Sequence, residues 1–167
     1  MTPSELLRML DELGISYESY EHEPVFTCEQ ALAAIPGETT AVQTKNLFLR
    51  DKRGRRHFLL VTDCEKAVDV KAFADQVGAD HLSFGSSERL GRYLGVEPGS
   101  VTVFGLANDA NNGVELYVDE DVWSKPRWRC HPLVNTGTLV VSREDLEVFF
   151  AKTGHKPRVL RLTTRLA

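Results

Sequence analysis

Lys45 is the residue whose setting most suggests chemistry. It stands near the start of the segment Thr44–Arg50, whose apolar, β-favouring residues predict a strand. A lysine in such a strand either extends its stem so that the ammonium reaches solvent, or points into a cleft where it can bind an anion or a carbonyl oxygen. Taken alone, the pattern favours the solvent-directed arrangement.

Two loops offer further polar groups. Gly99 lies in the loop Leu94–Gly105, whose glycines let the backbone approach a ligand, and exposed amides there could bind an oxyanion. The alternative is a plain turn before a strand. His131 lies in the polar loop Cys130–Gly137, which supplies an imidazole and an amide for orienting a substrate. An isolated histidine of this kind more often has a structural role.

Several familiar reaction types lack their motifs. The sequence has no G-x-S-x-G, no G-x-x-x-x-G-K-[ST], no G-x-G-x-x-G and no H-E-x-x-H, and its five histidines are scattered. The three cysteines, Cys28, Cys64 and Cys130, are far apart and form no C-x-x-C pair, so we expect neither a disulfide framework nor a zinc site. Cys130 beside His131 is interpreted as a buried apolar thiol rather than a nucleophile or metal ligand.

Composition limits the possible partners. A chain of 167 residues that is 42% hydrophobic predicts one domain, and no apolar run approaches the roughly 20 residues that span a membrane. The N-terminus does not resemble a secretory signal, so we expect a cytoplasmic protein. The net charge of −4 argues against a general binder of DNA or RNA. Two basic segments could still meet a few phosphates: residues 50–56 and a tail from about residue 155. Solvated surface is the alternative for both.

Local signals predict a mixed α/β (α+β) protein. Thr2, Pro3 and Glu5 form a helix start with a capping box, and later helices are expected to be capped by Asp69, by Ser86 or Ser87, and by Ser142. Irregular alternation of the elements indicates a mixed or mostly antiparallel sheet with helices around it, in one domain spanning residues 1–167. The expected helices cover residues 3–13, 28–35, 70–77, 87–94 and 143–153, with a helical turn at 119–123. The expected strands cover residues 15–21, 44–50, 56–62, 100–104, 113–118, 136–141 and 157–162.

Four segments together carry a family resemblance. They are the stretch Tyr20–Thr27, the Lys45-Asn46-Leu47 motif with its basic hairpin, the PGSVT loop, and the HPLVNT segment that runs into Ser142–Leu146. In this order and spacing they resemble the YbaK/prolyl-tRNA-synthetase-associated superfamily, and most closely its freestanding alanyl-tRNA(Pro) deacylases of the ProX (PrdX) type. The resemblance covers roughly residues 3–155.

The resemblance implies a fold and an activity. The fold is a mixed α/β domain with a curved sheet around a small pocket. The activity is hydrolysis of the ester that joins a wrongly attached amino acid to the 3′-terminal ribose of a tRNA, here alanine on tRNA(Pro). Such a second sieve is needed because a missing group or two gives only about 1–3 kcal/mol of discrimination. The resemblance implies no metal, cofactor or covalent nucleophile, because the substrate's own ribose hydroxyl assists the reaction.

The resemblance also implies residue roles. Lys45 is central, its ammonium holding the terminal phosphate or the ester carbonyl oxygen. Gly99 lends its backbone to the water or the oxyanion, and Asn46 and His131 orient the ester and ribose. The residues expected to wall the pocket are Tyr20 and Phe26. The bases expected to guide the acceptor stem are Arg50, Lys52, Arg53, Arg55 and Arg56.

One departure from the family pattern leaves alternatives open. Val103 stands where the family's glycine loop usually carries proline, so the pocket could accept another amino acid. The alternatives are a deacylase of tRNA mischarged with cysteine, serine, threonine or similar, and a non-catalytic module that binds tRNA or a synthetase. The expected partners are tRNA and also prolyl-tRNA synthetase.

Overall fold

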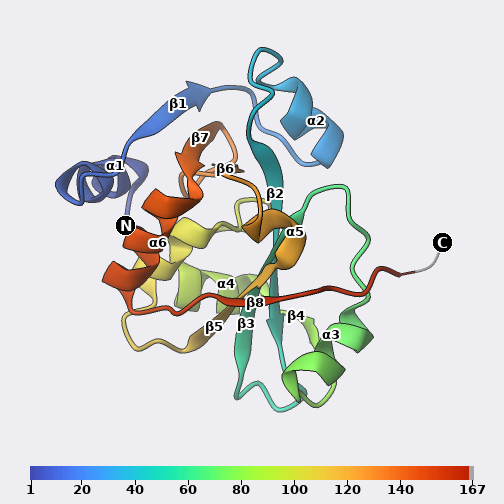
Figure 1. Ribbon diagram of the computed structural model, residues 1–167. Helices are drawn as coiled ribbons and strands as arrows, with labels where there is room; N and C mark the ends of the chain where they lie inside the picture. The colour runs from blue at the N-terminus through green and yellow to red at the C-terminus, as the bar shows by residue number, and fades with distance from the viewer. Residues whose placement is uncertain (166–167) are drawn as a thin grey trace.

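The computed structural model describes residues 1–165, and the strands in this part of the chain form one eight-stranded mixed sheet (Figure 1). The strand order is β1-β7-β6-β2-β3-β5-β8, and the short β4 pairs with β2. The strands are β1 (Tyr17–Glu21), β2 (Val42–Arg50), β3 (His57–Asp63), β4 (Ser83–Phe84), β5 (Val114–Asp119), β6 (Arg127–Cys130), β7 (Gly137–Ser142) and β8 (Arg158–Leu160).

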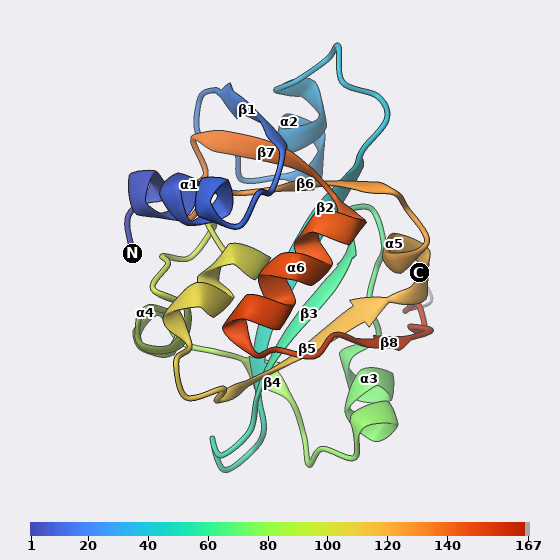
Figure 2. The same cartoon turned by 60° about the vertical axis from the view of Figure 1, so that its left-hand side comes forward.

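The sheet combines both kinds of pairing. β1–β7, β6–β7, β2–β3 and β2–β4 are antiparallel, whereas β2–β6, β3–β5 and β5–β8 are parallel. Figure 2 shows β6 and β7 running across the direction of β3 and β5, so the sheet is strongly curved. These observations confirm the expected mixed α/β class with a curved sheet.

The helices begin where the sequence predicts. Thr2 Oγ1 accepts a hydrogen bond from the Glu5 amide at 3.1 Å, and the Thr2 amide donates to Glu5 Oε1 at 3.0 Å, which is the expected capping box. Asp69, Ser86 and Ser142 cap three further helices that end at left-handed glycines. The helices are α1 (Pro3–Glu12), α2 (Cys28–Ala33), α3 (Val70–Val77), α4 (Ser87–Leu94), α5 (Glu120–Trp123) and α6 (Arg143–Thr153).

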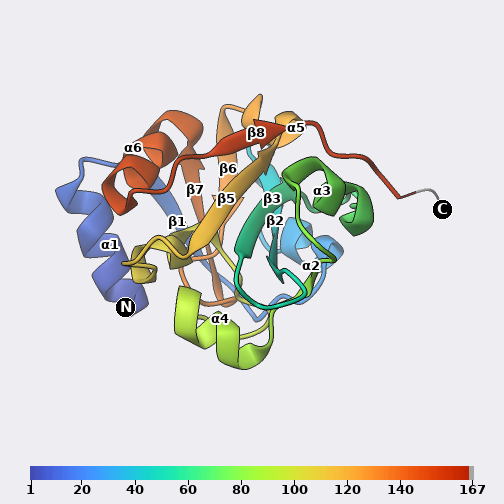
Figure 3. The ribbon, with the colours of Figure 1, turned by 90° about the horizontal axis from the view of Figure 1, so that it is seen from below.

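Two hydrophobic clusters hold the helices against the sheet. The larger contains Trp128, Phe104 and Phe149 together with buried residues of α1, α4 and α6. The smaller contains Phe58 of β3 and Phe73 of α3. Figure 3 shows α1 and α6 on one side of the strands and α3 on the other. β2 and β3 contribute to both clusters and therefore form the centre of the molecule.

One expected strand is absent, and two strands were missed. The strand predicted at residues 100–104 does not form: a 3₁₀ helix, η1 (Val103–Asn108), begins within this range, and the Thr102 hydroxyl caps it by accepting a hydrogen bond from the Phe104 amide. β4 was missed because it has only two residues. β6 was missed because two of its four residues are arginines, which are typical of exposed segments, although most of the strand is buried. Arg129 is only 3% exposed, and its guanidinium donates to the carbonyls of Ala31, in α2, and of Ile35 and Glu38, in the segment that follows α2.

The expectation of no disulfide was also wrong. Cys28, the first residue of α2, is bonded to Cys64, which follows β3, with their Cα atoms 5.5 Å apart. The sequence did not reveal this pairing, because the two cysteines are 36 residues apart and only the fold brings the start of α2 beside the end of β3. Cys130 is a free, buried thiol, as interpreted, and burial raises its pKa to about 12.

The basic tail packs against the body of the protein as far as Arg165. β8 pairs with β5, which confirms the expected edge strand, and the chain then runs beside the segment before α3. The Asp69 amide donates to the Thr163 carbonyl at 3.0 Å, and the Arg165 amide donates to the Ala67 carbonyl at 2.8 Å. Within residues 1–165, no helix has the length and apolar character needed to cross a membrane.

Candidate functional site

A cavity of about 280 Å³ lies against β2. β6 pairs with β2 only at Val42 and Gln43, and β4 pairs only at Leu49 and Arg50. Among the described strands, none pairs with the intervening residues 44–47 on this side, so the cavity opens at a free sheet edge. The start of α2, the Gly99 turn and His131 close the other sides. Its volume lies just below the range of typical ligand pockets, about 300–1,000 Å³, and suits a small group.

Lys45 is one of the residues that line this cavity. Its side chain is half-buried, and Nζ donates a hydrogen bond to the Lys66 carbonyl at 2.6 Å. Burial lowers the pKa of Lys45, the nearby Asp63 carboxylate opposes this shift, and Arg165 adds to it. An ammonium has three donors, so two remain for a substrate once the Lys66 carbonyl is bound. Burial on the free edge of β2 thus supplies a positioned cation.

Gly99 occupies a turn that glycine favours. The Ser100 amide donates to the Glu97 carbonyl at 3.0 Å, and Gly99 has a φ of +89°, as at the third position of a type II turn. A Cβ at Gly99 would lie 3.8 Å from the Phe26 ring, so conformation rather than space requires the glycine. Phe26 is 73% exposed and forms the rim of the cavity. The turn therefore presents backbone to the cavity.

His131 and Asn46 complete the polar lining. The His131 Nδ1–H donates to the Gly137 carbonyl at 3.1 Å, and burial lowers the pKa of the imidazole. The neutral ring consequently carries its free lone pair on Nε2, which can accept a hydrogen bond. Asn46 lines this cavity and an adjoining one of about 480 Å³, and Gly99 and Val101 also line both. Four of the predicted residues, Lys45, Gly99, Asn46 and His131, thus meet in one place.

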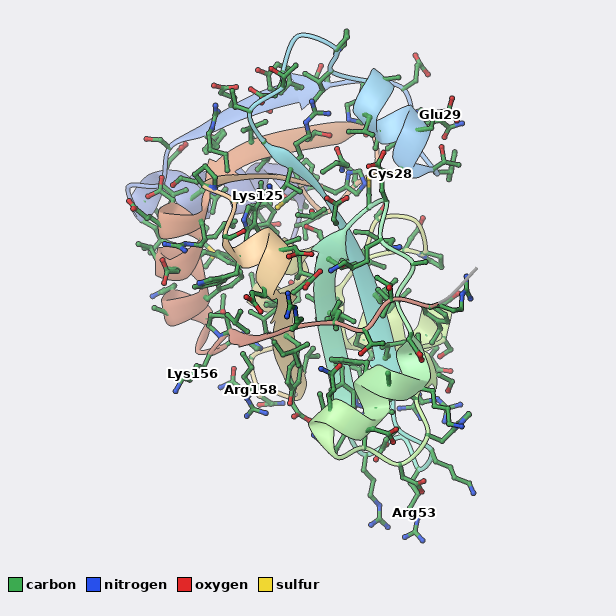
Figure 4. All side chains as sticks on the ribbon, turned by 45° about the vertical axis from the view of Figure 1, so that its right-hand side comes forward. Cys28, Glu29, Arg53, Lys125, Lys156 and Arg158 are labelled. Atoms are coloured by element: carbon green, nitrogen blue, oxygen red, sulfur yellow. A yellow bond between two sulfur atoms is a disulfide. The ribbon has the colours of Figure 1, made fainter. Side chains whose placement is uncertain are left out.

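Tyr20 and the basic hairpin lie elsewhere. Tyr20 is not among the residues lining the cavity, because its hydroxyl donates to Glu18 Oε2 at 2.7 Å on the edge strand β1. Since a strand rises about 3.3 Å per residue, Arg50 lies about 17 Å along β2 from Lys45. Figure 4 shows Arg53 at the far end of the hairpin from Cys28, which lines the cavity.

The five hairpin bases are not equivalent. Arg56 forms an ion pair with Glu115 at 2.9 Å, and Arg50 donates to the Asp51 and Lys52 carbonyls at 3.2 Å. Lys52, Arg53 and Arg55 are exposed. These three side chains are therefore the ones most available to an external phosphate.

Sequence reasoning missed part of the lining. Gln43 lies two residues before Lys45 and so shares its side of β2, a signal that strand periodicity could have supplied. The Cys28–Cys64 bond also lines the cavity. Val103, which we expected to affect the pocket, is fully buried in the core, whereas Val101 lines the cavity. Within the described residues, no group of three or more His, Cys, Asp or Glu side chains is placed to hold a metal ion.

Comparison with known proteins places this site in a family. Residues 22–149 match the model of the aminoacyl-tRNA editing domain. The chain belongs to the aminoacyl-tRNA editing domain family. The matched range contains Phe26, Lys45, Asn46, Gly99 and His131. Membership confirms the expected editing hydrolase and the resemblance found in the sequence.

Relatives of this editing domain cover nearly the whole chain. The "Prolyl-tRNA editing protein ProX" of Acetoanaerobium sticklandii is 38% identical over 157 residues, covering 94% of this chain and 95% of the relative. The "Prolyl-tRNA synthetase associated domain-containing protein 1" of Danio rerio is 31% identical, covering 93% and 85%. The crystal structure of a proposed trans-editing enzyme for prolyl tRNA synthetase has the same fold, with a TM-score of 0.72, 18% identity and 99% coverage of both chains.

Proposed function

We propose that this editing domain hydrolyses alanine from mischarged tRNA(Pro), acting in trans on the free aminoacyl-tRNA. The observation that supports this proposal most directly is the small cavity. Lys45, Gly99 and the neutral imidazole of His131 line it, and its volume suits one small acyl group. The name of the ProX relative, at 38% identity, supports tRNA(Pro) as the substrate RNA.

The two adjoining cavities suggest how the aminoacyl end is arranged. We place the amino acid in the smaller cavity and the terminal adenosine in the larger one. Asn46 and Gly99, which line both, then lie beside the ester that joins the two groups. The exposed ring of Phe84 in the larger cavity is available for stacking on a base.

The chemistry is attack by a positioned water on an activated ester. Water adds to the carbonyl carbon, the bond to the ribose 3′ oxygen breaks, and the proton passes to that oxygen, releasing alanine and tRNA. The Lys45 ammonium and the Gly99 backbone stabilise the oxyanion that develops. His131 Nε2 accepts a hydrogen bond from the neighbouring ribose hydroxyl and fixes the ester in orientation. Lys45 and nearby Arg165 also attract the terminal phosphate.

The inner walls account for a preference for small amino acids. Val25 and Ala31 are less than 10% exposed, and the Cys28–Cys64 bond ties the start of α2 to the end of β3. These residues cannot move apart easily to admit a larger group, because a close-packed interior transmits strain to its neighbours. Alanine fits, whereas the pyrrolidine ring of proline would have to displace them.

A panel of charged tRNAs tests this function. We expect alanyl-tRNA(Pro) to be deacylated at least 10- to 200-fold faster than prolyl-tRNA(Pro), since one or two methylenes supply that much discrimination. Release of radiolabelled amino acid from tRNA charged with alanine, proline, cysteine, serine or threonine measures the order. Faster hydrolysis of a cysteinyl, seryl or threonyl ester would move the assignment to that substrate. Stable binding without loss of any amino acid would identify a binding module instead.

The exposed hairpin bases are proposed to contact the acceptor stem. Replacing Arg53 and Arg55 with glutamine should weaken tRNA binding and reduce the slope of log affinity against log salt by about 0.7–0.9 for each phosphate that the variant no longer neutralises. Filter binding at several salt concentrations measures both quantities. The matched control replaces Arg8 and Lys152, exposed bases on α1 and α6. Unchanged affinity and salt slope in the hairpin variant would exclude this interaction.

The cellular setting follows from the substrate. Mischarged tRNA(Pro) arises where prolyl-tRNA synthetase works, so we propose the cytoplasm as the location and that synthetase as a functional partner. The name of the Danio rerio relative, a synthetase-associated domain, supports the association.

A further inference from the structure

Gln43 carries a buried polar atom that the rest of the fold does not use. Its side chain is 6% exposed and lines the smaller cavity. Nε2 donates a long hydrogen bond of 3.4 Å to the Thr44 carbonyl, whereas Oε1 has no hydrogen-bond partner among the described residues. Buried side-chain oxygens are normally satisfied, so an orphaned one beside a cavity indicates a missing donor.

The neighbouring groups do not supply that donor. The Thr44 hydroxyl is directed to the Arg129 carbonyl at 2.5 Å, and the Lys45 ammonium binds the Lys66 carbonyl. The terminal nitrogens of the Arg129 guanidinium donate to the carbonyls of Ala31 and Ile35, whereas its buried Nε, on the residue that pairs with Gln43, forms no hydrogen bond with any described residue, Gln43 Oε1 included. Because Gln43 lines the cavity, a ligand there can supply the donor that Arg129 Nε does not.

Position along the strand indicates which ligand atom this is. Gln43 and Lys45 are two residues apart on β2, so they lie on the same side of the strand with their Cα atoms about 7 Å apart. This side of the cavity thus presents an acceptor beside a donor. An aminoacyl ester offers the complementary pair on adjacent carbons, an α-amino donor and a carbonyl acceptor.

We propose that Gln43 Oε1 accepts a hydrogen bond from the α-amino group of the bound aminoacyl moiety. Gln43 thereby selects α-amino acyl groups over acyl groups of the same size that lack the amine. This inference rests on the proposed function, since it names the atom of that substrate which the buried oxygen recognises. With the carbonyl held by Lys45, the second contact fixes the acyl group at two points.

Binding of two stable amides tests the inference without turnover. An RNA hairpin with the tRNA(Pro) acceptor stem carries either a 3′-alanylamino or a 3′-propionylamino group on its terminal 3′-deoxyadenosine. The two ligands differ only in the α-amine. Wild type should prefer the alanyl form by about 10- to 100-fold, as for a hydrogen bond to a charged group. Gln43→Met keeps the side-chain length without the carbonyl and should reduce this preference to less than about 3-fold.

The control is Gln76→Met, at an exposed glutamine of α3, which should retain the wild-type preference. Two results would overturn the proposal: a wild-type preference that persists in Gln43→Met, or an equal loss of affinity for both amides, which would mean that Gln43 only supports the cavity. Hydrolysis of alanyl-tRNA(Pro) by wild type is measured separately. Its absence, with the binding preference intact, would remove the proposed reaction and leave the role of Gln43 standing.

Discussion

Lys45→Ala should reduce the rate of alanyl-tRNA(Pro) hydrolysis by about 100- to 1,000-fold while the protein stays folded. Loss of one positioned donor to a developing oxyanion has an effect of this size. Folding should tolerate the change, because the hydrogen-bond acceptor of Lys45 is the carbonyl of Lys66 and not a carboxylate that would be left unpaired. Single-turnover deacylation gives the rate, and circular dichroism with urea unfolding reports the fold.

A matched control separates this effect from a general loss of positive charge. Lys71→Ala removes an exposed ammonium from α3 and should leave deacylation unchanged. Turnover in Lys45→Ala within a few-fold of wild type would contradict the proposed mechanism. The same result would indicate that Lys45 is a solvent-directed strand lysine with no catalytic role, as its sequence pattern alone favours.

Loss of the Cys28–Cys64 bond should lower the free energy of unfolding by about 4 kcal/mol, because the bond restricts the unfolded chain over a large loop. The two cysteines are 36 residues apart in sequence. For a chain of this size the change corresponds to a fall in Tm of roughly 8–16 °C. Urea unfolding of the oxidised protein, compared with the Cys28→Ala/Cys64→Ala variant, measures the difference.

The double variant provides its own control for reductant. Dithiothreitol should destabilise wild type toward the variant and leave the variant unaffected, because the variant has no disulfide to reduce and its remaining cysteine, Cys130, is a free, buried thiol. Equal urea midpoints for oxidised wild type and the variant would show that the bond adds no stability. Deacylation by the variant reports whether the pocket walls keep their spacing without the bond, since both cysteines line the cavity.

Local chemistry made much of the fold predictable. The capping box at Thr2 and the cap at Ser142 depend on residues close in sequence, and each was placed correctly. β6 depends instead on distant partners, because Arg129 becomes tolerable in the interior only when it donates to the carbonyls of Ala31, in α2, and Ile35, just after it. The disulfide likewise depends on where the chain brings Cys28 and not on any local pattern.

The site was predictable to a similar extent. Family resemblance selected Lys45, Asn46, Gly99 and His131, and the structure places all four at one cavity. The alternation of residues along the strand could not show whether Lys45 faces solvent or a cavity. The cavity exists because β6 pairs with β2 only at Val42 and Gln43, which a sequence pattern does not reveal. The burial and unpaired state of Gln43 are properties of packing, which a sequence does not display.

Two valines in the loop after Gly99 serve different parts of the molecule. Val101 is half-buried and lines both cavities, whereas Val103 is fully buried at the start of η1. We expect substitution of Val101 to change which acyl groups the cavity accepts with little loss of stability, and substitution of Val103 to destabilise the core. Substrate range can therefore diverge among related chains through one loop position without loss of the scaffold that carries it.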